Sequence, residues 1–244
     1  RRDPENGRFG RNLLIVHEPT FYTSMDGAGW FEDFPNSVYE EKQALLDKYG
    51  IVIWRDHDHM HAHQPDGIFT GVLKYLGWDK NVTVEGSDGG FSHFLVEIPE
   101  TTVGELCAYV MEKVGMNGVR YIGDPQAKVS RLAFVGHLFP SPFVKRRSDG
   151  SVLEYSVQII KLLEERVDVI LPGEIIEWTV VSYIRDAVEL GKAKAMLNIG
   201  HFNWEELGMK YAREWISDLV ENSLPVTYVP TGDMYRLHCQ KGKK

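Results

Sequence analysis

Four histidines at alternate positions are the residues of this chain best suited to metal chemistry. His57, His59, His61 and His63 follow the apolar run 51–54, whose pattern predicts a buried strand. If the extended conformation continues beyond that run, alternate side chains point the same way, so several imidazoles share one face at the carboxyl end of the strand. Such a face is a metal-site geometry. The alternative interpretation is a surface tract rich in His and Asp that binds no ligand.

Two other segments place metal-capable side chains directly after predicted strands. His17 and Glu18 follow the first apolar run, and Pro19 disfavours a helical conformation at Glu18. His201 leaves a later strand, and Glu205 falls in the first turn of the next helix, where the helix dipole favours its ionised form. Taken alone, each histidine is more often a hydrogen-bonded rim residue than a ligand. Because open α/β sheets bind ligands at the carboxyl ends of their strands, the three segments could converge there.

Strand-like runs alternate with amphipathic helical runs along nearly the whole chain, and this alternation is typical of an α/β fold. Strands are predicted over residues 13–17, 51–54, 94–98, 119–122, 132–135, 167–171, 195–199 and 226–229. Helices are predicted over residues 37–49, 65–76, 102–114, 152–166, 174–190 and 203–222. The loops 82–90 and 137–150 interrupt this rhythm, and either of them could separate two lobes.

Residues that cap helices mark several of these boundaries. Thr102 with Glu105 three residues later predicts a capping box, and Asn203 with Glu206 offers a similar arrangement. Glycines of the kind that ends helices follow four of the helical runs. They are Gly50, Gly77, Gly115 and Gly191.

Composition and charge limit the classes of function. A chain of 244 residues with 43% hydrophobic residues can bury a core, and no apolar run approaches the roughly 18 residues that a membrane helix needs. We therefore expect a cytoplasmic protein without a membrane partner. The formal charge of −8 argues against a general nucleic-acid binder. The two cysteines, Cys107 and Cys239, cannot build a cysteine zinc site, so imidazole and carboxylate must hold any metal.

The order of these motifs resembles the Nif-three-like family, the dinuclear-metal-centre hexameric proteins that are often labelled GTP cyclohydrolase I type 2 homologues. The resemblance extends from Asn12 to about Val229. It is carried by the segments 12–19, 57–63 with the later Leu76-Gly77, 171–174 and 200–205. It implies a Nif-three-like fold, in which one domain over 1–244 consists of two interlaced α/β lobes with mixed sheets and a metal site in the cleft between them. Family members carry a strand and a helix before the first motif, so the polar segment 1–11 implies that these elements are absent or reduced.

The resemblance also implies a set of metal ligands. In the family, two adjacent histidines, an aspartate and a final His–Glu pair bind two divalent metals, and the Glu is shared. By this resemblance His17, His201 and Glu205 hold one metal, and Glu18, His61 and Glu205 hold the other. Glu18 replaces the family's second histidine, and His61 replaces its aspartate. The two replacements look like an exchange, because the totals remain three imidazoles and two carboxylates.

The expected ligands constrain the metals and the partner. Nitrogen and oxygen ligands without thiolate fit Zn, Fe, Mn, Co or Ni. Two divalent cations bring +4, the two glutamates bring −2 and a bridging hydroxide leaves about +1, so a small anionic substrate or phosphate is favoured. Imidazole ligands need partners that orient them, and the nearest candidates are Asp56, Asp58 and Glu174. His57 matches a family histidine, so the resemblance implies a place for it beside the metals.

These observations support two hypotheses from different classes. The leading one is a hydrolase with two metals that acts on a small phosphate-bearing or nucleotide-like compound, with metal-bound water as reactant and no catalytic side chain assigned. The alternative is a non-catalytic protein that binds or handles metal and interacts with a partner. For both, the resemblance implies a homo-oligomer, a ring-shaped hexamer. Metallo-β-lactamase or amidohydrolase sites fit less well, because the Asp-His pair expected two residues after an HxH step is missing.

Overall fold

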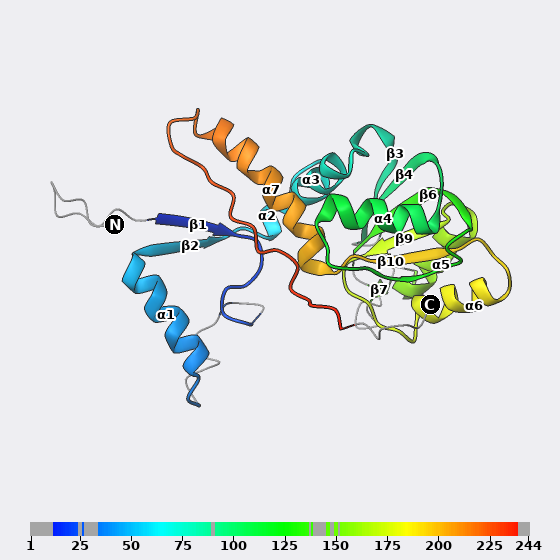
Figure 1. The fold of residues 1–244 in the computed structure, drawn as a ribbon, viewed down its shortest axis with the longest axis horizontal. Coiled ribbons are helices and arrows are strands. Elements are labelled where there is room, and N and C mark those ends of the chain that lie inside the picture. The colour runs from blue at the N-terminus through cyan, green and yellow to red at the C-terminus, as the bar shows by residue number, and fades with distance from the viewer. Residues whose placement is uncertain are drawn as a thin grey trace. The chain divides into compact units, whose positions relative to one another are not determined.

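Figure 1 shows the computed structural model of the chain, which describes residues 12–23, 26, 34–88, 91–136, 138, 145–146, 149–150 and 152–238. The chain divides into two compact units, Arg1–Gly67 and Ile68–Lys244. This division lies before both of the lobe boundaries expected from the sequence, 82–90 and 137–150, and most of the second of these lies outside the described residues. Each unit has its own strands and helices.

The first unit is built on two parallel strands that end at the same level. Its elements are β1 (Asn12–Val16), α1 (Ser37–Tyr49), β2 (Ile51–Arg55) and α2 (Asp58–Ala62). β1 pairs with β2 in register, from Asn12 opposite Ile51 to Val16 opposite Arg55. Helix α1 makes the crossover that a parallel pair requires, and Gly50 ends it in the left-handed conformation at φ 58°. Because the strands end together, the residues that follow Val16 and Arg55 emerge side by side.

The histidine run, which we define as residues 57–63, folds into a helical turn at α2. The expectation of a strand that continues beyond β2 is therefore wrong. His61 N donates to the carbonyl oxygen of His57 at 3.2 Å, and His63 N donates to that of His59 at 3.0 Å. The physical reason is the loss of the strand partner, because β1 stops where β2 stops and helical bonds then satisfy the backbone groups. Residues two positions apart in a helix point in directions that differ by about 200° around its axis. His57 and His61 therefore lie on one side of the helix, and His59 and His63 lie on the other.

The second unit contains a six-stranded mixed sheet. Its strands are β3 (Val82–Asp88), β4 (Phe91–Thr102), β5 (Arg120–Ile122), β6 (Lys128–Val135), β9 (Val169–Pro172) and β10 (Ala195–Asn198). They lie in the order β3-β4-β6-β9-β10-β5, in which β6, β9 and β10 are parallel and the other three run antiparallel to their neighbours. The short strands β7 (Lys145–Arg146) and β8 (Val152–Leu153) form a separate pair. The α/β class with a mixed sheet, predicted from the sequence, is thereby confirmed.

Helices cover both faces of this sheet, and each face has its own apolar core. The helices are α3 (Gly67–Leu76), α4 (Val103–Val114), α5 (Tyr155–Glu165), α6 (Val180–Glu189) and α7 (His201–Leu219), with a short 3-10 helix over Asp79–Asn81. Residues of α3, α4 and α7 pack with Leu132 and Phe134 on one face, and residues of α5 and α6 pack with Ala133 and Val135 on the other (Figure 1). Successive side chains of β6 thus point to opposite faces of the sheet, as expected for a strand that is buried on both faces. Among the described helices, none combines the length and apolar character that a membrane crossing needs.

Several elements of the second unit differ from the sequence-based expectation. The segment 82–90, expected as a loop, is mostly strand β3, because it pairs with β4 as one arm of a hairpin. The helix expected over 174–190 begins only at Val180. Ile175 makes a parallel bridge to Leu138 beyond the end of β9, and a turn over residues 177–179 precedes the helix.

The C-terminal segment is tied to α7 by side-chain contacts. Residues 226–229, expected as a strand, have no regular structure. The Glu206 carboxylate accepts hydrogen bonds from the backbone N of Gly232 at 3.1 Å and from the Tyr228 hydroxyl at 2.8 Å. The expected capping arrangement of Asn203 with Glu206 is therefore wrong. Glu206 bonds a distant segment instead, and α7 begins two residues earlier than predicted.

Helices α3 and α7 cross with glycine against glycine. A Cβ atom at Gly208 would lie 2.7 Å from Ile68 Cα and 2.8 Å from the Ile68 carbonyl oxygen, and one at Gly71 would lie 2.7 Å from Gly208 Cα. Backbone atoms are among those in the way at both positions, so a side chain at either glycine forces the helices apart. The crossing fixes the helix that begins with His201.

We predict that Gly208→Ala lowers the free energy of unfolding by about 1–3 kcal/mol through overpacking, even though alanine favours a helix by about 1 kcal/mol. Urea denaturation measures the change, with Arg213→Ala on the exposed side of α7 as the matched control. An unchanged or raised midpoint for Gly208→Ala would contradict the close crossing.

Asp168 fastens β6 to the residue that precedes β9. Its carboxylate accepts hydrogen bonds from the backbone N of Ser130 at 3.2 Å, from the backbone N of Arg131 at 3.1 Å and from the Arg131 guanidinium at 2.6 Å. Burial by itself raises the pKa of Asp168, but the hydrogen bonds from Arg131 and Ser130 outweigh burial and hold this pKa below its ordinary value.

We predict that Asp168→Asn costs about 1–3 kcal/mol of stability at neutral pH. Because the folded-state pKa lies below the unfolded-state value of about 3.9, this stabilisation is present above about pH 4 and is lost as the pH falls through the folded pKa. Urea denaturation at neutral and at acidic pH should show the difference between wild type and variant shrinking in acid. An equal difference at both pH values would mean that the ionised carboxylate is not its source.

Candidate metal centre

The common ends of β1 and β2 bring three histidines of the first unit together. His17 follows β1, while His57 and His61 lie one turn apart at α2. The ring centroid of His17 lies 4.6 Å from that of His57, and the His61 centroid lies 4.9 Å from His17 and 4.8 Å from His57. One ligand atom of each ring lies within 4.8 Å of those of the other two, which is close enough to share an ion. We call these three residues the histidine cluster.

Each ring of the histidine cluster has Nδ1 near an oxygen atom, and the contacts of His17 and His61 bear on which nitrogen can bind a metal. His17 Nδ1 lies 3.2 Å from the carbonyl oxygen of Asp56, and His61 Nδ1 lies 2.8 Å from Asp66 Oδ2. A carbonyl oxygen can only accept, so Nδ1 of His17 carries the hydrogen and Nε2 keeps its lone pair. The Asp66 carboxylate favours the same tautomer at His61. This is the arrangement by which proteins usually orient an imidazole that binds a metal.

The Nε2 atoms of His17 and His61 face each other at 3.1 Å. With a hydrogen on both Nδ1 atoms, two lone pairs would meet at this distance, so the contact calls for a positive charge between the rings. A proton on one ring or a metal ion bound at Nε2 supplies that charge. Imidazole nitrogens bind divalent metals at about 2.0–2.1 Å, and two of them on one tetrahedral ion lie roughly 3.3–3.4 Å apart. The two nitrogens here lie slightly closer than that, so the donor chemistry fits a divalent metal and the rings would separate slightly on binding.

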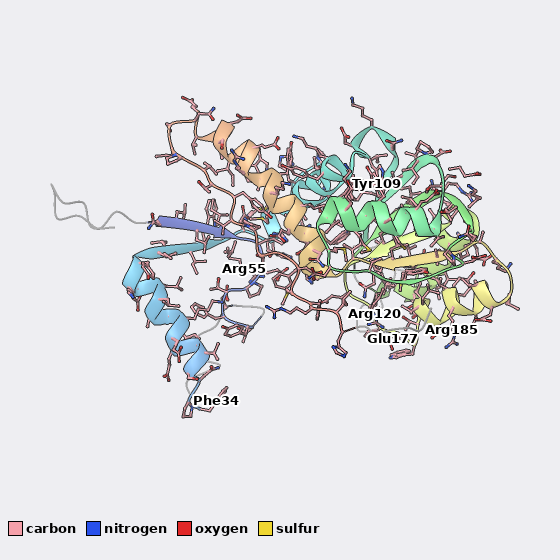
Figure 2. The ribbon with its side chains drawn as sticks, viewed as in Figure 1. Phe34, Arg55, Tyr109, Arg120, Glu177 and Arg185 are labelled. Carbon is pink, nitrogen blue, oxygen red and sulfur yellow. The ribbon has the colours of Figure 1, made fainter. Side chains whose placement is uncertain are left out.

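Glu18 adds a carboxylate beside the histidine cluster. Its Oε1 lies 3.6 Å from His57 Nε2, and His57 Nδ1 lies 2.7 Å from Asp58 Oδ1. Arg55, labelled in Figure 2, donates from Nε to the carbonyl oxygen of His17 at 3.4 Å and ties the end of β2 to the turn that carries the ligands. His57, expected from the resemblance beside the metals, thus belongs to a group that could hold an ion directly.

The second unit carries its own pair of candidate ligands near the start of α7. His201 Nε2 lies 2.9 Å from Glu205 Oε2, and His201 Nδ1 lies 3.4 Å from Glu174 Oε1. The i,i+4 spacing puts His201 and Glu205 on one side of the helix. Because α7 begins at His201, Glu205 lies beyond its first turn, so the expectation that Glu205 falls in the first turn is wrong. Glu174 and His201 follow the parallel neighbours β9 and β10, so both reach the same edge of the sheet. Glu174 is placed to orient the His201 ring.

The predicted ligands are thus found in two groups, one in each unit. His17 and His61 lie together in the first, with Glu18 near His57, and His201 contacts Glu205 in the second. These groups are candidate sites for metal binding by His and Glu. That all five ligands converge on two metals stays a prediction of the family resemblance.

Asp66 is a candidate functional residue that the sequence analysis did not single out. Its side chain is only 6% exposed and it contacts His61 Nδ1. The available signal was an acidic residue shortly after the histidine run and directly before an apolar helix. That signal is weak, because aspartates commonly precede helices for reasons of capping alone.

Comparison with known proteins identifies relatives in sequence. No family model matches the chain. A GTP cyclohydrolase 1 type 2 homolog of Clostridium perfringens is 22% identical over 205 residues, which cover 82% of this chain and 68% of that protein. A protein of the same name from Clostridium acetobutylicum is 23% identical over 199 residues, which cover 80% of this chain and 64% of that protein. The chain therefore spans about two thirds of the length of the curated relatives it matches.

Comparison with solved structures identifies the fold. A crystal structure of a Staphylococcus aureus protein matches with a TM-score of 0.62 at 14% identity, over 93% of this chain and 80% of that one. A Bacillus cereus protein related to NIF3 matches with a TM-score of 0.60 at 13% identity, over 93% and 83% of the two chains. The chain has the Nif-three-like fold. The fold and the curated relatives together support the Nif-three-like family assignment that the motifs predicted.

We predict that Asp66→Ala lowers the metal affinity of this Nif-three-like chain by about 10- to 100-fold, because His61 loses the partner that orients it. Asp66→Asn retains an oxygen that can accept from Nδ1 and should lose less. Competition with a chromophoric chelator measures the affinity, and Asp79→Ala at an exposed position is the matched control. Equal affinity of Asp66→Ala and Asp79→Ala would show that Asp66 does not support a ligand.

Proposed function

We propose that this chain binds two divalent metal ions and acts as a metal-dependent hydrolase on a small phosphate-bearing or nucleotide-like substrate. The observation that carries the proposal is the 3.1 Å approach of His17 Nε2 to His61 Nε2, with Nδ1 of each ring turned to an oxygen atom. Two imidazoles held in this way are poised to coordinate a cation rather than to bond each other.

The proposed centre uses ligands from both units. His17, His201 and Glu205 would hold one metal, and Glu18, His61 and Glu205 would hold the other, as the family resemblance implies. The contact of His201 with Glu205 supports the contribution of the second unit, because the two donors already share one side of α7. The mixture of imidazole and carboxylate suits Zn, Fe, Mn, Co or Ni.

The side chains have separate tasks in this proposal. Bound divalent metals activate water and neutralise negative charge on a substrate. Asp66 orients His61, and the carbonyl oxygen of Asp56 orients His17, so the ligand nitrogens are in place before an ion arrives. Two divalent ions exceed the charge of the two glutamates, which favours an anionic substrate.

The names of the curated relatives agree with a substrate that contains a nucleotide or a phosphate. Both relatives are called GTP cyclohydrolase 1 type 2 homolog. A shared fold does not fix a reaction, so the substrate has to be found by assay. A non-catalytic metal-binding protein is the alternative outcome of that assay.

We predict that His17→Ala in the first unit and Glu205→Gln in the second both lower the content of the same metal, because each removes a ligand of one shared ion. Inductively coupled plasma mass spectrometry after loading with Zn, Mn, Fe or Co measures this content. The double variant should lose little more than Glu205→Gln alone, because Glu205 is a ligand of both ions and the ion held by His17 is already lost. Both variants should also lower the rate of hydrolysis in a nucleotide and phosphoester panel by roughly 100-fold or more. This loss is larger than the loss usually caused by removing a residue that only orients a ligand.

His238→Ala, at an exposed position outside the candidate ligands, is the control for loss of a histidine. Additive losses of metal in the double variant would contradict a shared centre. Full metal content without turnover of any compound in the panel would contradict the hydrolase and favour the non-catalytic alternative.

A further inference from the structure

Half of the histidine run, His59 and His63, has no part in the proposed centre. These residues lie one turn apart, because His63 N donates to the His59 carbonyl oxygen at 3.0 Å. Each is two residues from a member of the histidine cluster, which corresponds to about 200° around a helix, so they emerge on the other side of α2. The side chain of His59 is 91% exposed, and His63 is exposed as well. We call them the outer pair.

Both rings of the outer pair have Nδ1 turned to an oxygen atom, as in the histidine cluster. His59 Nδ1 lies 3.2 Å from Asp56 Oδ1, and His63 Nδ1 lies 2.9 Å from the carbonyl oxygen of Pro65. The carbonyl oxygen of Pro65 requires a hydrogen on Nδ1 of His63, and the Asp56 carboxylate favours one on Nδ1 of His59. Each Nε2 then keeps the lone pair with which an imidazole binds a metal.

We propose that His59 and His63 form a second, solvent-exposed site that binds one divalent transition metal ion through two imidazoles. Residues at i and i+4 of a helix have Cβ atoms about 5–6 Å apart, a separation that two imidazole rings can close around one ion. Imidazole donors suit Zn, Ni, Co or Cu and disfavour Mg and Ca. With two protein ligands and the other positions open to water, the ion exchanges faster here than in a buried site.

Asp56 connects the outer pair to the histidine cluster. Its carboxylate holds His59, its carbonyl oxygen holds His17, and the residue itself is only 9% exposed. An ion captured by the outer pair is therefore concentrated one residue away from the candidate centre. A role in loading rests on the proposed function, whereas binding of an ion by the outer pair does not.

Retention of the untagged chain on immobilised Ni²⁺ tests this site, because an ion fixed to a column reaches only exposed imidazoles. The measurement is the imidazole concentration that elutes the protein. We expect His59→Ala and His63→Ala each to lower it clearly. The double variant should lower it little further, since chelation requires both rings. His238→Ala removes an exposed histidine outside the run and should elute with the wild type.

A variant that combines His17→Ala with His61→Ala removes two rings of the histidine cluster and should also elute with the wild type. Unchanged elution of His59→Ala and His63→Ala would overturn the outer site, as would an equal shift in His238→Ala. Column retention tests the outer pair, whereas metal content tests the proposed centre. A negative result for one proposal can therefore be distinguished from a negative result for the other. Circular dichroism of each variant confirms that elution compares folded proteins.

Discussion

Two parallel strands that stop at the same level determine where metal chemistry can occur in the first unit. The register of β1 and β2 ends with Val16 opposite Arg55, so the turn with His17 and the turn with His57 begin beside each other. Asp56 N still donates to the Val16 carbonyl oxygen at 2.9 Å, and beyond it the chain satisfies its backbone in helix α2. The helical turn then brings His61 back toward His17. The imidazoles of His17, His57 and His61 therefore lie together because β1 and β2 end at the same level.

The same device orients imidazoles in both units. His17 and His61 direct Nδ1 to oxygen acceptors and Nε2 to each other, and His201 directs Nδ1 to Glu174 and Nε2 to Glu205. Nitrogen lone pairs and carboxylates are thereby fixed by neighbouring oxygen atoms before a ligand is present. Preorganised donors lower the cost of ordering a site when an ion binds. The glycine crossing of α3 and α7 serves the same end, because it fixes the helix that carries His201.

Sequence reasoning succeeded where the signal was local. The capping box of Thr102 and Glu105 is present, and α1 ends where Gly50 adopts the left-handed conformation. Residues with such short-range chemistry act on their own neighbours, so a pattern a few residues long is enough to predict them. The alternation of strands and helices followed from hydrophobic periodicity in the same way.

It failed where a distant partner decides the local conformation. The histidine run looked extended because its spacing is two residues, but its conformation depends on where β1 ends. Glu206 matched a capping pattern, yet its carboxylate bonds a segment more than 20 residues away, as its contact with Tyr228 shows. Asp66 was missed because its contact with His61 exists only once the run has folded into a helix. Contacts of this kind have no signature in a single sequence.

Anomalous X-ray scattering from crystals of the chain grown with Zn²⁺ tests the central claim most directly. We predict two zinc ions, one bonded to Nε2 of His17 and the other to Nε2 of His61 at about 2.0–2.1 Å, with both Nδ1 atoms still facing the oxygens of Asp56 and Asp66. Rings that remain in direct contact with no anomalous peak at Nε2 of either one, in crystals that hold zinc elsewhere, would contradict this prediction.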